Sequence, residues 1–220
     1  MNNLTLQGPK KGLAVIKKEV EKAITDLESR LHVLADFPIG IRLHESRVKY
    51  DKQIGMKTPR WHVGNTSADG SIDLLHPNSF EKHSSHSKGN FIKVLKHELW
   101  HAFAKKIADA AAIPVWLNEG LAMCVAGQDV HYKNQRGYYI EENFAAKLST
   151  EHGWSTYVNH DAYQYACLFT CFLAEKYSLE KLLKLLRSLN KNYYHPHFEE
   201  KFKEVFGISL SEAERDFANA

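Results

Sequence analysis

Residues 91–108 read FIKVLKHELWHAFAKKIA, a stretch without glycine or proline that predicts one continuous helix. Asn90 directly precedes the stretch and suits the N-cap position. Lysines occupy one side of this helix, which is the side expected to face solvent. Apolar residues recur at helical spacing on another side and are expected to be buried: Ile92, Leu95, Leu99, Ala102 and Phe103.

The middle of this helix carries the pentapeptide His97-Glu98-Leu99-Trp100-His101, which has the pattern H-E-x-x-H. Residues four apart lie on one face of a helix, so both imidazoles can reach a single metal ion. Glu98 follows the first histidine and can address a water molecule on that ion without being a ligand. A chain rich in histidine and glutamate can also produce this pattern by chance, on an ordinary surface helix. A third ligand is needed to decide between the two interpretations.

A candidate third ligand stands in the next segment, where residues 115–122 read VWLNEGLA. A site with two histidines needs one more protein ligand, which leaves the fourth position open for water. A carboxylate on the following helix is one established solution. Glu119 offers such a carboxylate, and seventeen residues separate it from His101.

The HELWH helix and the WLNEG run together resemble the gluzincin metallopeptidases, a group that includes the aminopeptidase N family. In that group the third ligand is a glutamate about eighteen residues after the helix motif, within a similar run, so this chain is shorter by one residue. The resemblance implies that Zn²⁺ is the cofactor and that His97, His101 and Glu119 bind it. It also implies that Glu98 is the general base that activates water for attack on an amide.

Two later stretches resemble the peptidase MA-like branch, which consists of small gluzincins without the large flanking domains of the aminopeptidases. One begins as DAYQYA at Asp161, and the other is FEEKFKEVFGISL in residues 198–210. With the zinc motifs, the resemblance covers about the last 130 residues of the 220-residue chain. It implies a zincin-like bilobed α+β fold.

We expect residues 1–220 to form a single metallopeptidase catalytic domain. Residues 1–36 are predicted to be an N-terminal helix, which is amphipathic over 12–35. Residues 37–110 should form a small mixed sheet and the HExxH helix, with a strand or hairpin in 37–50 and short strands in 60–64 and 71–76. Residues 111–220 are expected to form an all-helical lobe.

A tyrosine or histidine from the C-terminal lobe of gluzincins stabilises the oxyanion that develops when water adds to the carbonyl. The resemblance makes Tyr163 the first candidate, because it opens a helix downstream of the ligands. Tyr165 and His160 are the alternatives. Each has a purely structural interpretation, since Tyr165 can belong to the core and His160 to the helix cap region beside Asp161.

The substrate-binding strand is predicted at Ile72, Asp73 and Leu74, because an edge strand beside the active-site helix of zincins pairs with the substrate backbone. Aminopeptidases carry a GxMEN anchor for the free amine of the substrate at this edge, and this sequence has none. The prediction is therefore a zinc endopeptidase. Two alternatives remain: a non-proteolytic zinc-bearing module that binds peptides or regulates, and a metal-dependent hydrolase of small-molecule or cell-wall amides.

Composition and charge agree with the peptide or protein substrate that the resemblance implies. The formal net charge is +3, and the lysines are scattered rather than striped with aromatic residues, so a nucleic acid partner is not expected. The first twenty residues contain no apolar run long enough for a signal peptide or a membrane span, which predicts a cytoplasmic protein without a membrane partner. Cys124, Cys167 and Cys171 stand in apolar helical contexts and are expected to be buried free thiols.

Overall fold

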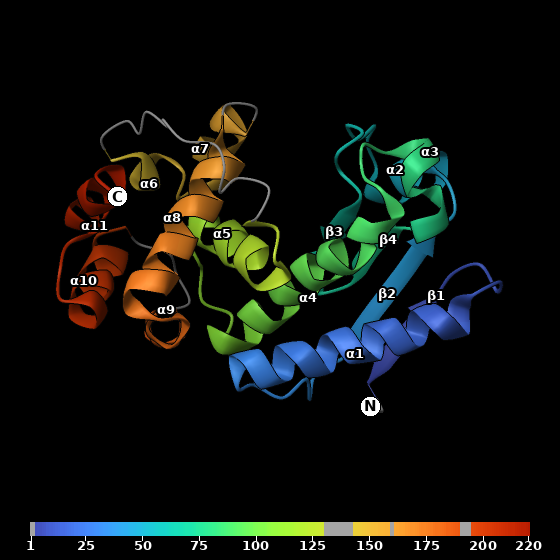
Figure 1. Cartoon of the computed structure of the whole chain (residues 1–220), viewed down its shortest axis with the longest axis horizontal. Helices are drawn as coiled ribbons and strands as arrows, with labels where there is room; N and C mark the ends of the chain where they lie inside the picture. The colour runs from blue at the N-terminus through green and yellow to red at the C-terminus, as the bar shows by residue number, and fades with distance from the viewer. Residues whose placement is uncertain (1–2, 130–142, 159–160, 190–194) are drawn as a thin grey trace. The chain divides into compact units, whose positions relative to one another are not determined.

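The structure is a computed structural model that describes residues 3–129, 143–158, 161–189 and 195–220. The order of the elements can be followed by colour in Figure 1. Contacts between residues divide the chain into two compact units, residues 1–103 and 104–220.

The first unit contains a small sheet with helices. Its elements in chain order are β1 (Leu4–Gln7), α1 (Leu13–Leu31), β2 (Ile39–His44), α2 (Arg47–Ile54), β3 (Gly64–Thr66), β4 (Ile72–Leu75), η1 (Pro77–Ser79), α3 (Phe80–His83), η2 (Lys88–Asn90) and α4 (Phe91–Ile107). The last of these helices continues past residue 103 into the second unit. The predicted amphipathic N-terminal helix is confirmed as α1, and its buried side chains include Ile16, Val20 and Leu27.

The four strands form one mixed sheet in the order β1-β2-β4-β3. The β1–β2 and β2–β4 pairs are parallel, whereas β3 runs antiparallel to β4. The small mixed sheet predicted from the sequence is therefore confirmed. The prediction of a helix alone for residues 1–36 missed β1, a four-residue strand whose side chains alternate between half-buried and exposed.

Strand β4 lies inside this sheet, between β2 and β3, and all four of its residues are buried. The prediction that Ile72, Asp73 and Leu74 form the substrate-binding edge is therefore wrong. Ile72 and Leu74 point into the core, and the Asp73 carboxylate accepts hydrogen bonds from Arg42, at 2.9 and 2.7 Å, on the neighbouring strand. A strand with both sides covered suits a central position, and the edge beside it is β3.

The segment after β2 differs from the predicted strand or hairpin of residues 37–50. Only residues 39–44 are extended, and α2 begins at Arg47. Ser46 caps this helix, because its side chain accepts a hydrogen bond from the amide of Lys49. The local cap outweighs the alternation of apolar and polar residues that had suggested a second strand.

The second unit is helical throughout its described residues, as predicted for residues 111–220. Beyond the end of α4 its elements are α5 (Val115–Ala126), α6 (Phe144–Lys147), α7 (Glu151–Tyr157), α8 (Ala162–Tyr177), α9 (Leu179–Arg187), α10 (His195–Phe206) and α11 (Leu210–Ala218). Helices α5 and α8 pack directly against each other. No helix in the described part of the chain is long and apolar enough to cross a membrane.

The cysteines differ from the prediction of three free thiols. Cys124 of α5 and Cys171 of α8 form a disulfide, whereas Cys167 is buried and takes no part in a disulfide. The two bonded residues are 47 positions apart in the sequence. Their pairing follows from the close packing of α5 on α8, which spacing along the chain does not reveal. The bond ties α5, the helix that carries Glu119, to α8.

Candidate metal centre

Helix α4 places His97 and His101 on one face. Leu95, Leu99 and Phe103 of the same helix are completely buried and set the rotation of the helix about its axis. The two imidazoles, four residues apart, are half-buried, and their ring centroids lie 5.1 Å from each other. The predicted amphipathic helix and its histidine pair are therefore present.

Helix α5 positions Glu119 through its first turn. The backbone amides of Val115 and Trp116 donate hydrogen bonds to the carbonyl oxygens of Ser149 and Leu148, each at 3.2 Å. These bonds satisfy donors that the start of a helix leaves without an intrahelical partner. The Trp116 ring is completely buried. The beginning of α5 is thus anchored one turn before Glu119.

Gly120, next to Glu119, lies where α5 comes closest to α8. A β-carbon added there would lie 2.1 Å from Thr170 Oγ1 and 2.2 Å from the carbonyl oxygen of Ala166. Only a residue without a side chain permits this approach between the two helices. The position of Glu119 relative to α8 therefore depends on this glycine.

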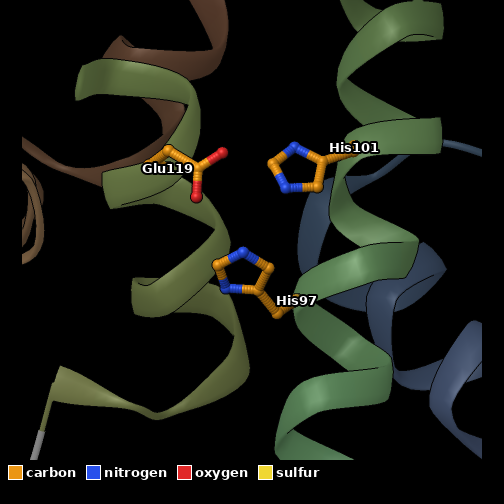
Figure 2. A group of neighbouring side chains, drawn as sticks. All are labelled: His97, His101 and Glu119. Carbon is orange, nitrogen blue, oxygen red and sulfur yellow. The ribbon is translucent and has the colours of Figure 1, made fainter. Parts of the chain in front are cut away.

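His97, His101 and Glu119 form the group shown in Figure 2, in which both rings face the carboxylate on the neighbouring helix. Each offers one ligand atom, and the three atoms all lie within 4.8 Å of one another. Two imidazole nitrogens and one carboxylate oxygen are a donor set that zinc accepts, with a fourth position left for water. The three side chains are half-buried, so a metal ion and a water molecule can reach them. The residues present fit a zinc ion.

The side chain of Glu98, next to His97 in the sequence, is buried and held by strand β3. It is 7% exposed, and Thr66 Oγ1 lies 2.8 Å from its Oε2 and 3.0 Å from its backbone carbonyl oxygen. A β-carbon on Gly64 would lie 2.5 Å from Oε1 of the same carboxylate. Strand β3 therefore supplies both a hydrogen-bond donor and the space that the carboxylate occupies.

The three candidates for an oxyanion donor have different positions. Tyr163 is half-buried in the first turn of α8, where its ring packs edge-on against Trp154 with 4.9 Å between centroids. Its role at the metal centre stays a prediction. His160 lies outside the described residues.

Tyr165 belongs to the core of the second unit. It is completely buried, and its hydroxyl donates a hydrogen bond to Glu214 Oε1 at 2.7 Å. The same oxygen accepts the backbone amide of Ala145 at 2.8 Å. Burial raises the pKa of both the Tyr165 hydroxyl and the Glu214 carboxyl. Since this hydroxyl is already used in an internal bond, the structural interpretation of Tyr165 is the one that holds.

Sequence reasoning missed Gly64 and Thr66, the two residues of β3 that contact Glu98. Strand β3 has only three residues, GNT, without apolar alternation, and it overlaps the short strand predicted over residues 60–64 only at Gly64. Asn65 and Thr66 read as part of a turn. Their contact with α4 spans 32 positions of sequence between Thr66 and Glu98. No local sequence pattern predicts such a contact.

Comparison with known proteins adds no assignment. No family model matches the chain, and neither the curated proteins nor the solved structures give a match.

Proposed function

We propose that this chain is a zinc-dependent metallopeptidase of the gluzincin type, with the zincin-like arrangement of a sheet-containing lobe and a helical lobe. The observation that carries the proposal is the convergence of His97, His101 and Glu119, whose ligand atoms lie within 4.8 Å of one another. Glu98 stands next to the first of these ligands in the sequence and is held by Thr66. A site that only binds a ligand has no need of this additional carboxylate.

The roles of the residues follow from their chemistry. A zinc ion, when bound, lowers the pKa of coordinated water to about 7 and polarises a carbonyl group. Glu98 takes the proton of the attacking water and passes it to the departing amine. The hydrogen bond from Thr66 and the space at Gly64 hold this carboxylate in one orientation. Tyr163 is proposed as an oxyanion donor on the resemblance alone.

The position of β3 favours a peptide over a small molecule as the substrate. This strand is an edge of the sheet, and it contacts Glu98 directly through Thr66. An extended peptide adds to a sheet edge through main-chain hydrogen bonds, which would bring its backbone beside the general base. We therefore assign to β3 the substrate-binding role that the sequence had suggested for the next strand. The missing amine anchor favours an endopeptidase.

The test is cleavage of a mixed-sequence library of quenched fluorescent peptides by the zinc-loaded protein, with and without a chelator. We expect cleavage at internal bonds that stops with 1,10-phenanthroline and returns on adding Zn²⁺. Cleavage confined to the first residue would instead indicate an aminopeptidase. A zinc-loaded protein that cleaves no peptide in the library contradicts the proposal.

Replacing Gly64 with alanine should lower the rate of peptide hydrolysis by roughly a hundredfold and leave the zinc content unchanged. The added β-carbon would lie 2.5 Å from Glu98 Oε1 and 2.8 Å from Cγ, so the carboxylate has to move. A displacement of about 1 Å in a catalytic group can cost this much. Gly40→Ala, in β2, is the matched control because no atom lies within 4 Å of its added β-carbon. Undiminished turnover in Gly64→Ala would show that the rate does not depend on this contact.

A further inference from the structure

A second polar side chain, His62, lies near Glu98 in the segment that leads into β3. The backbone pairing of the edge extends back to Val63, whose carbonyl oxygen accepts the amide of Leu75 at 2.9 Å. His62 directly precedes this paired stretch, and its amide donates to the carbonyl oxygen of Pro59 at 3.1 Å, which closes the turn before β3. Gly64 and Thr66 of β3 contact Glu98, and the charge of the same carboxylate acts on His62.

The position of the His62 ring is determined by Tyr50. The Tyr50 hydroxyl lies 2.9 Å from His62 Nδ1 and has no other hydrogen-bond partner among the described residues. Because Tyr50 is completely buried, a hydroxyl that accepted from Nδ1 would leave its own proton unpaired, which is unfavourable. The hydroxyl therefore donates to Nδ1. The remaining proton of a neutral imidazole is then on Nε2.

The directions in which the pKa values of His62 and Tyr50 shift also favour a neutral imidazole. Burial lowers the pKa of His62 below its usual value, against the opposing effect of the Glu98 carboxylate and, more weakly, of Asp51. Arg47 acts in the same direction as burial. Burial and then the charge of Glu98 also raise the pKa of the Tyr50 hydroxyl, which keeps it protonated. At neutral pH the ring is thus an uncharged donor close to the general base.

The backbone around His62 is fixed by a single half-buried arginine, Arg47. Arg47 donates to the carbonyl oxygen of His62 through Nη1 and to that of Arg60 through Nη2, the latter at 3.1 Å. It also donates to Thr58 Oγ1 at 2.7 Å and to the carbonyl oxygen of His83 at 2.9 Å. Segment 58–62 is therefore held in place before any ligand arrives, so His62 can contribute a donor at little entropic cost.

We propose that His62 binds the peptide substrate directly, with Nε2–H donating a hydrogen bond to a backbone carbonyl oxygen of the peptide on β3. This inference rests on the proposed function. Nδ1 bonds to the buried Tyr50 hydroxyl, whereas no described residue accepts a hydrogen bond from Nε2 of this half-buried ring. A neutral donor beside an edge strand and a carboxylate base suits the uncharged carbonyl of an extended peptide.

The kinetic test compares His62→Ala with His62→Gln, whose side-chain amide can place a donor near the position of Nε2. We expect kcat/KM for the fluorescent peptides to fall roughly tenfold to a hundredfold in His62→Ala, the range for a hydrogen bond left unmade, and less in His62→Gln. Zinc content, measured on the same samples, should stay close to that of the wild type, whereas the melting temperature of His62→Ala should fall because the buried Tyr50 hydroxyl loses its acceptor. Values of kcat/KM within threefold of the wild type in His62→Ala overturn the assignment.

A second test determines the tautomer of His62 by a measurement that does not depend on peptidase activity. In ¹⁵N NMR spectra of the metal-free protein, His62 should carry its proton on Nε2, and Tyr50→Phe should shift the Nδ1 resonance most. A proton on Nδ1 overturns the inference even where the peptidase is active. If the wild type itself cleaves no peptide, the proposed function fails and the role of His62 fails with it. If the wild type is active and the His62→Ala variant is equally active, only the proposed role of His62 is contradicted.

Discussion

Glu98→Gln should lose peptide hydrolysis by a factor of about 10²–10⁴ while it binds as much zinc as the wild type. The amide has almost the shape of the carboxylate, and its oxygen can still accept the hydrogen bond that Thr66 now makes at 2.8 Å. It cannot take a proton from water, and that proton transfer typically contributes a factor of this size. The measurement pairs initial rates on the cleaved peptide with zinc content by mass spectrometry.

The control for Glu98→Gln is Glu19→Gln, the same change of charge at an exposed position in α1. Its turnover should match that of the wild type. The pKa of His62 provides a second measurement, because the Glu98 carboxylate raises the pKa of that ring. In Glu98→Gln the pKa of His62, measured by NMR, should therefore fall. Unchanged turnover in Glu98→Gln would remove Glu98 as the base.

Gly120→Ala should destabilise the protein by about 1–3 kcal/mol, which is the usual cost of an overpacked helix contact. Alanine is intrinsically the better helix former by about 1 kcal/mol, so the sign of the change depends on the space at this position. The added β-carbon would lie 2.1 Å from Thr170 Oγ1 and 2.2 Å from a backbone carbonyl oxygen of α8, and the latter cannot turn away. The melting temperature should fall by about 2–4 °C for each kcal/mol.

The same substitution should weaken zinc binding roughly tenfold, because Glu119 precedes Gly120 and moves with α5. Gly89→Ala is the control, since the nearest atom to its added β-carbon is a side-chain oxygen at 3.7 Å. Thr170→Ala, combined with Gly120→Ala, should restore only part of the stability, because the carbonyl of Ala166 remains in the way. A Gly120→Ala protein as stable as the wild type would contradict the close packing of α5 on α8.

The parts of the structure that the sequence predicts well are those with a strong local signal. The apolar stripes of α1 and α4 predict long helices. The i, i+4 spacing alone places His97 and His101 on one face. Glu119 was a candidate because zinc chemistry requires a third ligand and the resemblance supplied its position. In the structure its carboxylate lies with the two histidines.

The failures have a common physical cause, which is contact between residues far apart in the sequence. The order of strands in a sheet depends on packing against the helices, so the internal position of β4 was not visible in IDLL itself. The disulfide of Cys124 with Cys171 and the contact of Thr66 with Glu98 are of the same kind. At α2 the error was local, because a serine cap ended the extended segment earlier than the alternation suggested.

The metal ligands themselves provide the most direct test, since every proposed role depends on zinc at His97, His101 and Glu119. The measurement is zinc bound per chain after dialysis, for the wild type, His101→Ala and Glu119→Ala, with the exposed His152→Ala as control. We predict one zinc ion per chain in the wild type and in the control, and little or none in the two ligand variants. A full zinc ion retained by Glu119→Ala would contradict the proposed metal centre.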